Sequence, residues 1–179
     1  AQRNGPHSLG IGDFDKDGKP DVAFIGGNSS TVVVYRNTST GSTISFGPRL
    51  TFPGTLFTGT IIATDIDNDG KSDLLVNSNT NYLLALRNTS TEGNINFESL
   101  QIPTELTAND LAAGDLDNDG KSDLVFASYY NARVFFYKNL SVPGLVLYDS
   151  PKEYITGGAP SSISLMDVTG DSKNDLIVS

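Results

Sequence analysis

The sequence predicts an all-β fold built from four-stranded units, and three observations support this prediction. A nine-residue acidic motif occurs four times, beginning at Asp13, Asp65, Asp115 and Asp167, with spacings of 52, 50 and 52 residues. Each period holds short apolar runs separated by Gly, Asn and Ser turns, with almost no helical periodicity. A fixed period of this size with four strands per period is typical of a β-propeller, in which each period forms one blade.

The repeats divide the chain into about three and a half blades. We expect one propeller segment over residues 1–179, with repeats at about 8–59, 60–109 and 110–160 and a partial repeat at 161–179. A β-solenoid or a sandwich fits less well, because their periods are shorter or absent. Because a ring with half a blade missing exposes an edge and an apolar face, we expect part of a longer propeller of which about half is present or, as a second choice, association with another chain.

The apolar runs give the expected strands in the order in which they occur. The first repeat is expected to hold Val22–Gly26, Thr31–Arg36 and Thr43–Phe52, and the second Ile61–Thr64, Asp73–Val76, Tyr82–Arg87 and Ile95–Ile102. The third is expected to hold Leu111–Gly114, Asp123–Ala127, Arg133–Lys138 and Val146–Ile155, and Asp175–Val178 follows the last acidic motif. A polar turn is expected at residues 28–30, and the acidic motif joins the first and second strands of each repeat.

Each acidic motif places several carboxylates on one tight turn. Close carboxylates repel one another by roughly 1 kcal/mol per pair in water and about 4 kcal/mol at a protein surface. One lysine per turn does not balance this charge. All-oxygen ligands favour a hard cation, and Ca²⁺ accepts them in a more flexible geometry than Mg²⁺ does. The sequence therefore predicts Ca²⁺ in the first three turns, and a fourth, weaker site where Thr169 replaces a carboxylate and Ser172 replaces the turn glycine.

The spacing within the motif suggests which atoms hold the ion. Aspartates at positions one, three and five match the start of an EF-hand loop, but position twelve is apolar, so the carboxylate at position nine is expected to complete the site. The lysine at position seven is expected to contribute its backbone carbonyl. The alternative is a solvated Asp/Gly turn without an ion. The expected ligands are Asp13, Asp15, Asp17, Lys19 and Asp21; Asp65, Asp67, Asp69, Lys71 and Asp73; Asp115, Asp117, Asp119, Lys121 and Asp123; and Asp167, Thr169, Asp171, Lys173 and Asp175.

Composition excludes several other classes of function. The net charge is −9, from 12 basic and 21 acidic residues, and no Lys/Arg patch indicates a nucleic-acid partner. The absence of cysteine excludes a disulfide framework and a thiol nucleophile. No apolar run approaches the roughly 20 residues that span a bilayer, so membrane insertion is not expected, and the first residues do not resemble a signal peptide. The single histidine, His7, is expected at the surface.

The pattern Asp-x-Asp-x-Asp-Gly-x-x-Asp, between a small-residue strand and an apolar strand, resembles the FG-GAP repeat and the related VCBS repeats of bacterial surface proteins. The resemblance covers residues 8–179 and implies the seven-bladed, calcium-binding propeller of integrin alpha subunits. Only Phe46-Gly47 keeps the Phe-Gly dipeptide, and Phe57-Thr58-Gly59 approximates it, so the bacterial type is the closer match.

The resemblance also implies that ligands bind at the rim opposite the acidic turns. Here that rim would include residues 28–30, 53–59, 77–81 and 128–132. Tyr129 and Tyr130 are candidate aromatic anchors, because tyrosine offers an apolar ring and a polar tip. The alternative is that both pack on a neighbouring blade as ordinary loop residues.

Three hypotheses for the function follow. We expect a calcium-stabilised extracellular or cell-surface adhesion module that binds a protein or glycan, since such open calcium sites fill where Ca²⁺ is abundant. An enzyme is a second hypothesis, because close carboxylates can perform acid–base chemistry. Against it, copies of one motif in every repeat indicate a shared structural role, so we expect no catalytic residues. The third is an accessory or spacer domain of a larger secreted enzyme, such as a polysaccharide-degrading one.

Overall fold

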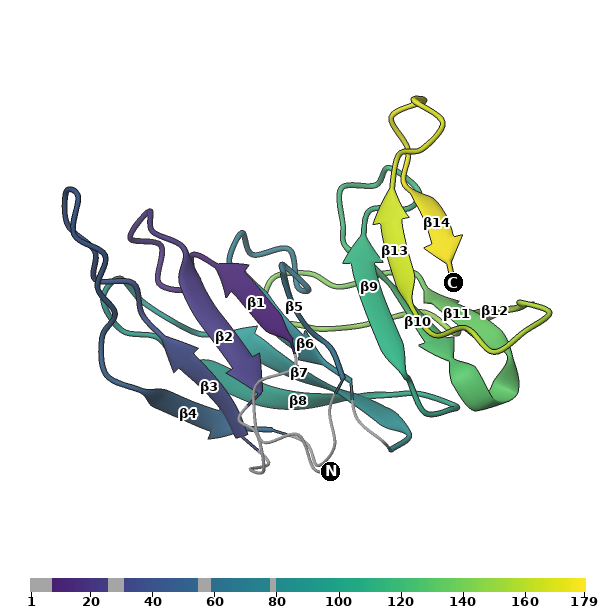
Figure 1. The fold of residues 1–179 in the computed structure, drawn as a ribbon, viewed down its shortest axis with the longest axis horizontal. Coiled ribbons are helices and arrows are strands. Elements are labelled where there is room, and N and C mark those ends of the chain that lie inside the picture. The colour runs from purple at the N-terminus through teal and green to yellow at the C-terminus, as the bar shows by residue number, and fades with distance from the viewer. Residues whose placement is uncertain (1–7, 26–30, 55–58, 78–79) are drawn as a thin grey trace.

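The computed structural model describes residues 8–25, 31–54, 59–77 and 80–179, which form three four-stranded antiparallel sheets and one hairpin (Figure 1). Strand order follows the chain within each sheet, so every sheet is a meander. This confirms the all-β fold and the arrangement in about three and a half blades. The strands are β1 (Leu9–Gly12), β2 (Asp21–Ile25), β3 (Thr31–Tyr35) and β4 (Leu50–Pro53); β5 (Ile61–Thr64), β6 (Asp73–Val76), β7 (Tyr82–Asn88) and β8 (Phe97–Pro103); β9 (Asp110–Gly114), β10 (Asp123–Ser128), β11 (Arg133–Tyr137) and β12 (Lys152–Ile155); and β13 (Ile163–Met166) and β14 (Asp175–Val178).

The first strands of successive sheets lie next to one another. β1 contacts β5, β5 contacts β9, and β9 contacts β13, so the sheets fan out from these inner strands (Figure 1). Small residues allow this approach: a Cβ on Gly10 would lie 3.3 Å from Leu74 Cδ2, and one on Gly12 would lie 3.0 Å from Ser72 Cβ, both in the second blade. Glycine at these positions therefore lets the blades pack closely near their common edge.

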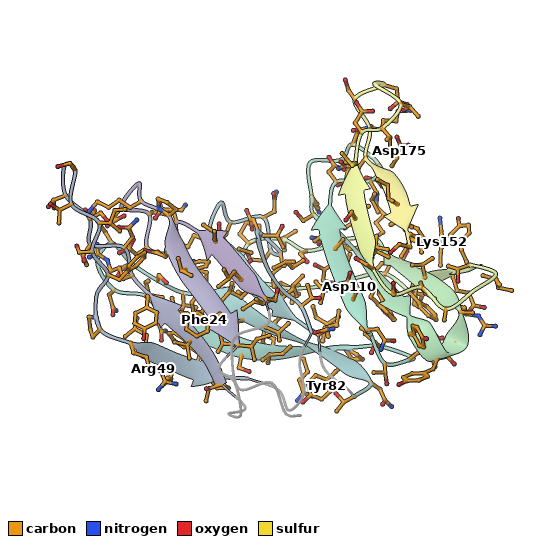
Figure 2. All side chains as sticks on the ribbon, in the orientation of Figure 1. Phe24, Arg49, Tyr82, Asp110, Lys152 and Asp175 are labelled. Carbon is orange, nitrogen blue, oxygen red and sulfur yellow. The ribbon has the colours of Figure 1, made fainter. Side chains whose placement is uncertain are left out.

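Polar bonds also join the inner strands. The backbone N–H of Ile61 donates to Ser8 Oγ at 3.1 Å, and that of Ile163 donates to Asp110 Oδ2 at 3.0 Å. The other oxygen of Asp110, Oδ1, accepts from the Thr60 hydroxyl at 2.5 Å. Asp110, which Figure 2 labels beside β9 and β13, thus connects three successive blades through one carboxylate.

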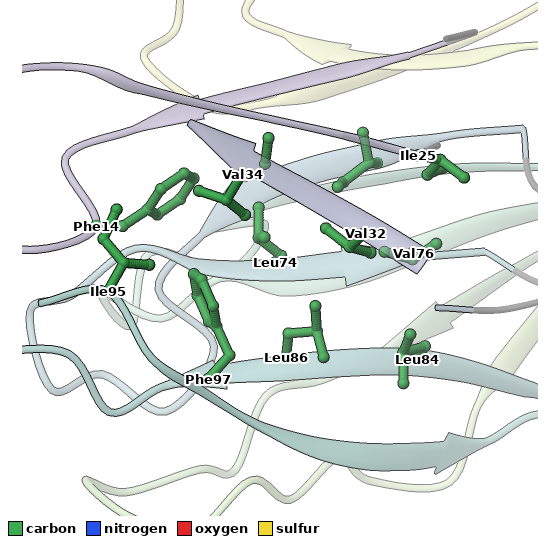
Figure 3. Close-up of a cluster of buried hydrophobic side chains, with 12 residues drawn as sticks. Phe14, Ile25, Val32, Val34, Leu74, Val76, Leu84, Leu86, Ile95 and Phe97 are labelled. Atoms are coloured by element: carbon green, nitrogen blue, oxygen red, sulfur yellow. The ribbon is translucent and has the colours of Figure 1, made fainter. Parts of the chain in front are cut away.

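The apolar core lies between blades and not within a single sheet. Ile25, Val32 and Val34 of the first blade pack against residues of the second blade such as Leu74 and Leu86 (Figure 3). A second cluster joins the second and third blades, and a third joins the third blade to the β13–β14 hairpin. Because each sheet buries its faces against its neighbours, the stability of the fold depends on contacts between adjacent blades, as in other repeat proteins.

All three outer strands begin later than the sequence predicted, the second by only two residues, at Phe97 instead of Ile95. The expected strands Thr43–Phe52 and Val146–Ile155 are observed only from Leu50 and Lys152 onwards. Before those points the chain makes isolated bridges, Asn37 with Phe46 and Asn139 with Tyr148. The cause is a proline, because Pro48 and Pro151 lack the N–H that would continue the ladder. In the second repeat, which has no proline there, the strand runs from Phe97 to Pro103.

Asn88 connects the first and second blades by its buried side chain. Its amide donates to the Phe14 carbonyl of the preceding blade and to the Ser72 carbonyl of its own turn, each at 2.8 Å. Its carbonyl oxygen accepts from the Ser90 N–H at 2.8 Å. Asn139 makes the corresponding bonds between the second and third blades. A buried polar group left without its partner is costly, so this asparagine should matter for stability.

We predict that Asn88→Ala lowers the free energy of unfolding by roughly 2–4 kcal/mol, because two buried carbonyls lose their donor. Urea unfolding followed by circular dichroism measures the change. The matched control is Asn96→Ala, whose exposed amide bonds only the Thr89 hydroxyl at 2.7 Å and which should change stability by less than about 0.5 kcal/mol. Equal losses in the two variants would contradict the assigned role of Asn88.

Candidate metal centres

The four acidic turns share one backbone path. In the first three, the residue at position four and the glycine at position six have positive φ, with Lys16 at 60° and Gly18 at 83° in the first turn. In the fourth turn the glycine stands at position four, as Gly170 with φ 78°, and Ser172 at position six has φ 66°. Because asparagine and glycine tolerate this region best, the fourth turn keeps the shape with less favourable chemistry.

Positions one and nine hold this shape through backbone hydrogen bonds. Asp13 accepts the N–H groups of Asp17 and Gly18 at 3.1 and 2.8 Å. Asp21, at position nine, accepts the N–H of Phe14 at 2.9 Å through Oδ2 and that of Asn37 at 2.8 Å through Oδ1. The second and third turns repeat all four bonds. These two aspartates therefore fix each turn to its own third strand.

Position three faces the next blade. Asp15 Oδ2 accepts the N–H of Gly93, and Asp67 Oδ2 accepts the N–H of Gly144, at 3.0 and 2.8 Å. Both glycines lie in the turn between the third and fourth strands of the following blade. The two carboxylates are buried, whereas the side chain of Asp117 in the third turn is 42% exposed. The burial of a turn thus depends on the blade that follows it.

A basic side chain at the end of the third strand reaches each of these carboxylate groups. Arg36 pairs with Asp15 and, at 2.6 Å, with Asp17. Lys138 pairs with Asp117 and, at 3.1 Å, with Asp119. The sequence-based view that one lysine per turn supplies the only nearby positive charge was therefore wrong. The signal was present in the sequence, because the segments Tyr35-Arg36-Asn37, Leu86-Arg87-Asn88 and Tyr137-Lys138-Asn139 repeat with the period.

The negative charge of the second turn is the least well compensated of the three. Arg87 lies 3.5 Å from Asp67, but its guanidinium also bonds Glu98 at 2.5 Å. Asp67 Oδ1 is buried and has no hydrogen-bond partner. Burial raises the pKa of the neighbouring Asp73 to about 7, and the charges of Asp67 and Asp65 add to the effect, although backbone N–H groups oppose it. A cation is the partner that such an arrangement lacks.

In the first turn, hydrogen bonds outweigh the effect of burial on the pKa of one carboxyl. Burial raises the pKa of the Asp15 carboxyl, but the hydrogen bonds from Arg36 and the Gly93 N–H outweigh it and hold that pKa below its ordinary value. Burial raises the pKa of Asp21 and of Asp123, the position-nine residues of the first and third turns. Burial therefore raises the pKa of the position-nine carboxyl in all three turns.

Three groups of carboxylates have ligand atoms within 4.8 Å of one another. The donors are all carboxylate oxygens, as a hard cation such as Ca²⁺ requires, and Asp67, whose Oδ1 has no partner, belongs to the second group. The residues present therefore fit a calcium ion. In the part of the chain that the structure describes, no such group forms in the fourth turn. The groups are Asp13, Asp15 and Asp17; Asp65, Asp67 and Asp73; and Asp115, Asp117 and Asp123.

The remaining predicted ligands do not belong to these three groups. The lysines at position seven, such as Lys19 and Lys71, donate their N–H groups to the position-five carboxylates at 2.9 and 2.8 Å. The role of every predicted residue as a metal ligand stays a prediction, including the carbonyls of these lysines, Asp21, Asp69, Asp119 and the fourth-turn residues.

The rim opposite the acidic turns carries two adjacent tyrosines. Tyr129 and Tyr130 lie in a single 3₁₀ turn, Tyr129–Asn131, and their rings meet edge to face with centroids 5.3 Å apart. They are 44% and 84% exposed, so both present ring surface to solvent. The predicted turn at residues 28–30 and most of the 53–59 connection lie outside the described residues, as does His7. No helix among the described residues is long and apolar enough to cross a membrane.

Comparisons with known proteins agree with this architecture. A profile of the FG-GAP-like repeat matches residues 13–76, 65–126 and 115–178, in register with the acidic turns. A search of curated proteins found no significant match. Among solved structures, the chain is similar to the one titled "Crystal structure of BBS1N in complex with ARL6DN, soaked with mercury", with a TM-score of 0.54 and 14% sequence identity. The match covers 98% of this chain and 60% of that one, and at this identity it shows the fold alone. The three consecutive repeat matches show that the chain belongs to the FG-GAP-like repeat family.

Proposed function

We propose that this protein is a calcium-stabilised propeller module that binds a protein or glycan outside the cell. The observation that carries the calcium part is the second turn, where Asp65, Asp67 and Asp73 converge and one buried oxygen of Asp67 has no partner. The third turn groups the same three positions, one, three and nine, and the first turn groups positions one, three and five. Because these carboxylates are repeated in successive blades, we assign them a role that all the blades share, which is to stabilise the turn and its junction with the next blade.

Bound calcium would act on both the turn and the junction between blades. It would be held by the aspartates of each turn, and it would supply positive charge to carboxylates that burial penalises. Asp15 and Asp67 each use one oxygen to accept an N–H from the next blade. Fixing these side chains therefore also fixes the next blade.

The binding role is assigned to the opposite rim. Tyr129 and Tyr130 are exposed there on a short connection between two core strands, and exposed aromatic residues on rigid scaffolds are frequent binding anchors. The similar structure was solved in a complex with another protein, which makes a protein ligand a reasonable choice. An extracellular location follows from the calcium requirement, since sites of this kind fill at high Ca²⁺ concentration.

The second candidate is an accessory or spacer domain of a larger secreted enzyme. The repetition of the motif supports it. The acidic groups lie in equivalent turns, as a structural role requires, and none of them lies at the rim that carries the tyrosines. No catalytic role is assigned to any residue of this chain in either proposal.

We predict that calcium raises the melting temperature of the chelated protein by at least about 5 °C, because ligand binding to the native state alone stabilises it by mass action. Differential scanning calorimetry with excess chelator and then with millimolar Ca²⁺ measures the effect. Mg²⁺ at the same concentration is the control and should stabilise less. An unchanged melting curve in calcium would contradict the proposal.

We predict that Asp67→Ala destabilises the calcium-loaded protein by roughly 2–3 kcal/mol, whereas Thr169→Ala changes stability by less than about 0.5 kcal/mol. Asp67→Asn separates two causes, since its carbonyl still accepts the Gly144 N–H but its charge is lost. We expect Asp67→Asn to approach wild-type stability in chelator and to fall below it in calcium. If its deficit were the same in both conditions, Asp67 would not be a ligand.

We predict that a glycan array or a panel of extracellular-matrix proteins yields a ligand whose affinity falls at least about tenfold in Tyr130→Ala, because a central aromatic anchor contributes roughly 1.4 kcal/mol or more. Val142→Ala is the matched control, because Val142 is 50% exposed but lies in a turn on the side of the acidic motifs. Binding that depends on Val142 and not on Tyr130 would place the ligand on the rim of the acidic turns and contradict the proposal. If no ligand is found, the spacer function is favoured.

A further inference from the structure

The outward face of the first sheet is apolar and exposed. We call it the first-blade flank and define it as Leu9, Ile11, Val22, Phe24, Tyr35 and Phe46. Leu9, Ile11 and Phe46 are 58%, 62% and 46% exposed. Phe24, labelled in Figure 2, stacks on Tyr35 with ring centroids 6.0 Å apart. Single exposed apolar residues are ordinary, but a contiguous apolar face of this kind usually marks an interaction surface.

The other blades show what covers this face. Alignment of the repeats places the second-blade residues Ile61, Ala63, Leu74, Val76, Leu86 and Phe97 at the six flank positions. All of them belong to the cluster that packs against the first blade. The third-blade equivalents Leu111, Ala113, Leu124, Phe126, Tyr137 and Tyr148 belong to the cluster that packs against the second blade. In both cases the covering surface is the preceding blade.

The first blade also has polar groups at the positions that bond the preceding blade in the other repeats. Gly93 and Gly144 donate their N–H groups to a position-three aspartate of the preceding blade. The equivalent Gly41 also has a positive φ, 55°, and among the described residues nothing accepts its N–H. Asn37 corresponds to Asn88 and Asn139, and its amide donates to its own turn at Pro20 O, 2.9 Å away. The described residues contain no counterpart of the second bond that Asn88 makes to Phe14 O.

We propose that the first-blade flank is the docking surface for a further blade of the same repeat, placed ahead of residue 8 in the fan. That blade carries an acidic turn with Asp at position three, which accepts the Gly41 N–H. It carries a large apolar residue at position two, as Phe14 and Ile66 do in the two observed junctions, and this residue packs against Phe46. The carbonyl of that same residue accepts from the Asn37 amide.

A second copy of this chain does not supply such a blade. The matching face of its third blade is covered by the β13–β14 hairpin, through Val125, Ala127 and Ile163. Its fourth module has only two strands, and Thr169 stands at position three in place of the carboxylate that Gly41 requires. The occupant is therefore a complete blade with an intact acidic motif.

The test adds such a blade and measures whether the flank becomes protected. Residues 60–109 are duplicated directly before Ser8, which reproduces the spacing between the second and third repeats. The chain has no cysteine, so Ile11→Cys gives a unique thiol on the flank, at a position where the other blades carry Ala63 and Ala113. We expect at least tenfold slower thiol labelling of Ile11→Cys in the extended protein. Glu153→Cys on β12 is the control and should label at an unchanged rate.

A second pair of variants tests the specific hydrogen bond. Asp67→Ala in the added copy alone removes the acceptor for Gly41 and should restore at least half of the lost labelling rate. Asp67→Asn in that copy keeps an acceptor and should retain the protection. Residues 110–161 serve as an alternative added blade in case the first does not fold, with folding judged by circular dichroism.

Three outcomes would overturn the proposal. The first is equal labelling of Ile11→Cys with and without either folded added blade. The second is full protection by the Asp67→Ala copy, which would show that the flank does not select an acidic turn. The third is protection of Ile11→Cys in the 179-residue chain as its concentration rises, with dimers in sedimentation velocity, because the occupant would then be a second copy.

Discussion

The fold depends on how crowded carboxylates are neutralised at the junctions between blades. A buried carboxylate is costly unless hydrogen bonds and positive charge compensate it. At the first two junctions the compensation comes from both sides: Arg36 or Arg87 from the same blade, and the N–H of Gly93 or Gly144 from the next one. The acidic turn and the packing of blades are therefore parts of one interaction, because a turn is completed only when the following blade is in place.

The three junction turns differ in how far their own residues neutralise them. Arg36 bonds both Asp15 and Asp17, whereas Arg87 divides its charge between Asp67 and Glu98. Asp67 and Asp73 are buried, as Asp15 and Asp21 are in the first turn, so the two turns differ in how far their charge is compensated and not in burial. The demand for a metal ion should accordingly be greatest in the second turn. An arginine that already occupies the carboxylates would instead compete with an ion in the first.

Much of the fold was predictable from the sequence because its signals are local. The acidic turns, their glycines and the apolar strands that follow them lie within a few residues of one another, and the period places them in successive blades. The partners Arg36, Arg87 and Lys138 were missed, although they also repeat, because they stand about twenty residues after the turn and reach it only when the meander folds. The contacts of Gly93 and Gly144 are more distant still, since they cross from one blade to the preceding one. No pattern within a single repeat identifies them.

The fourth module separates two roles that the motif combines elsewhere. Asp167 keeps the backbone bonds of position one, Asp175 keeps the position-nine bond to the N–H of Val168, and Gly170 and Ser172 keep the two left-handed residues. The shape of the turn therefore does not need a carboxylate at position three, where this module has Thr169. In the first two modules one oxygen of the position-three carboxylate bonds the next blade, although Asp15 Oδ1 also accepts the N–H of Asp17 in its own turn, so this residue serves the junction as well as the turn. A substitution at this position should consequently change how blades join while leaving the local turn intact.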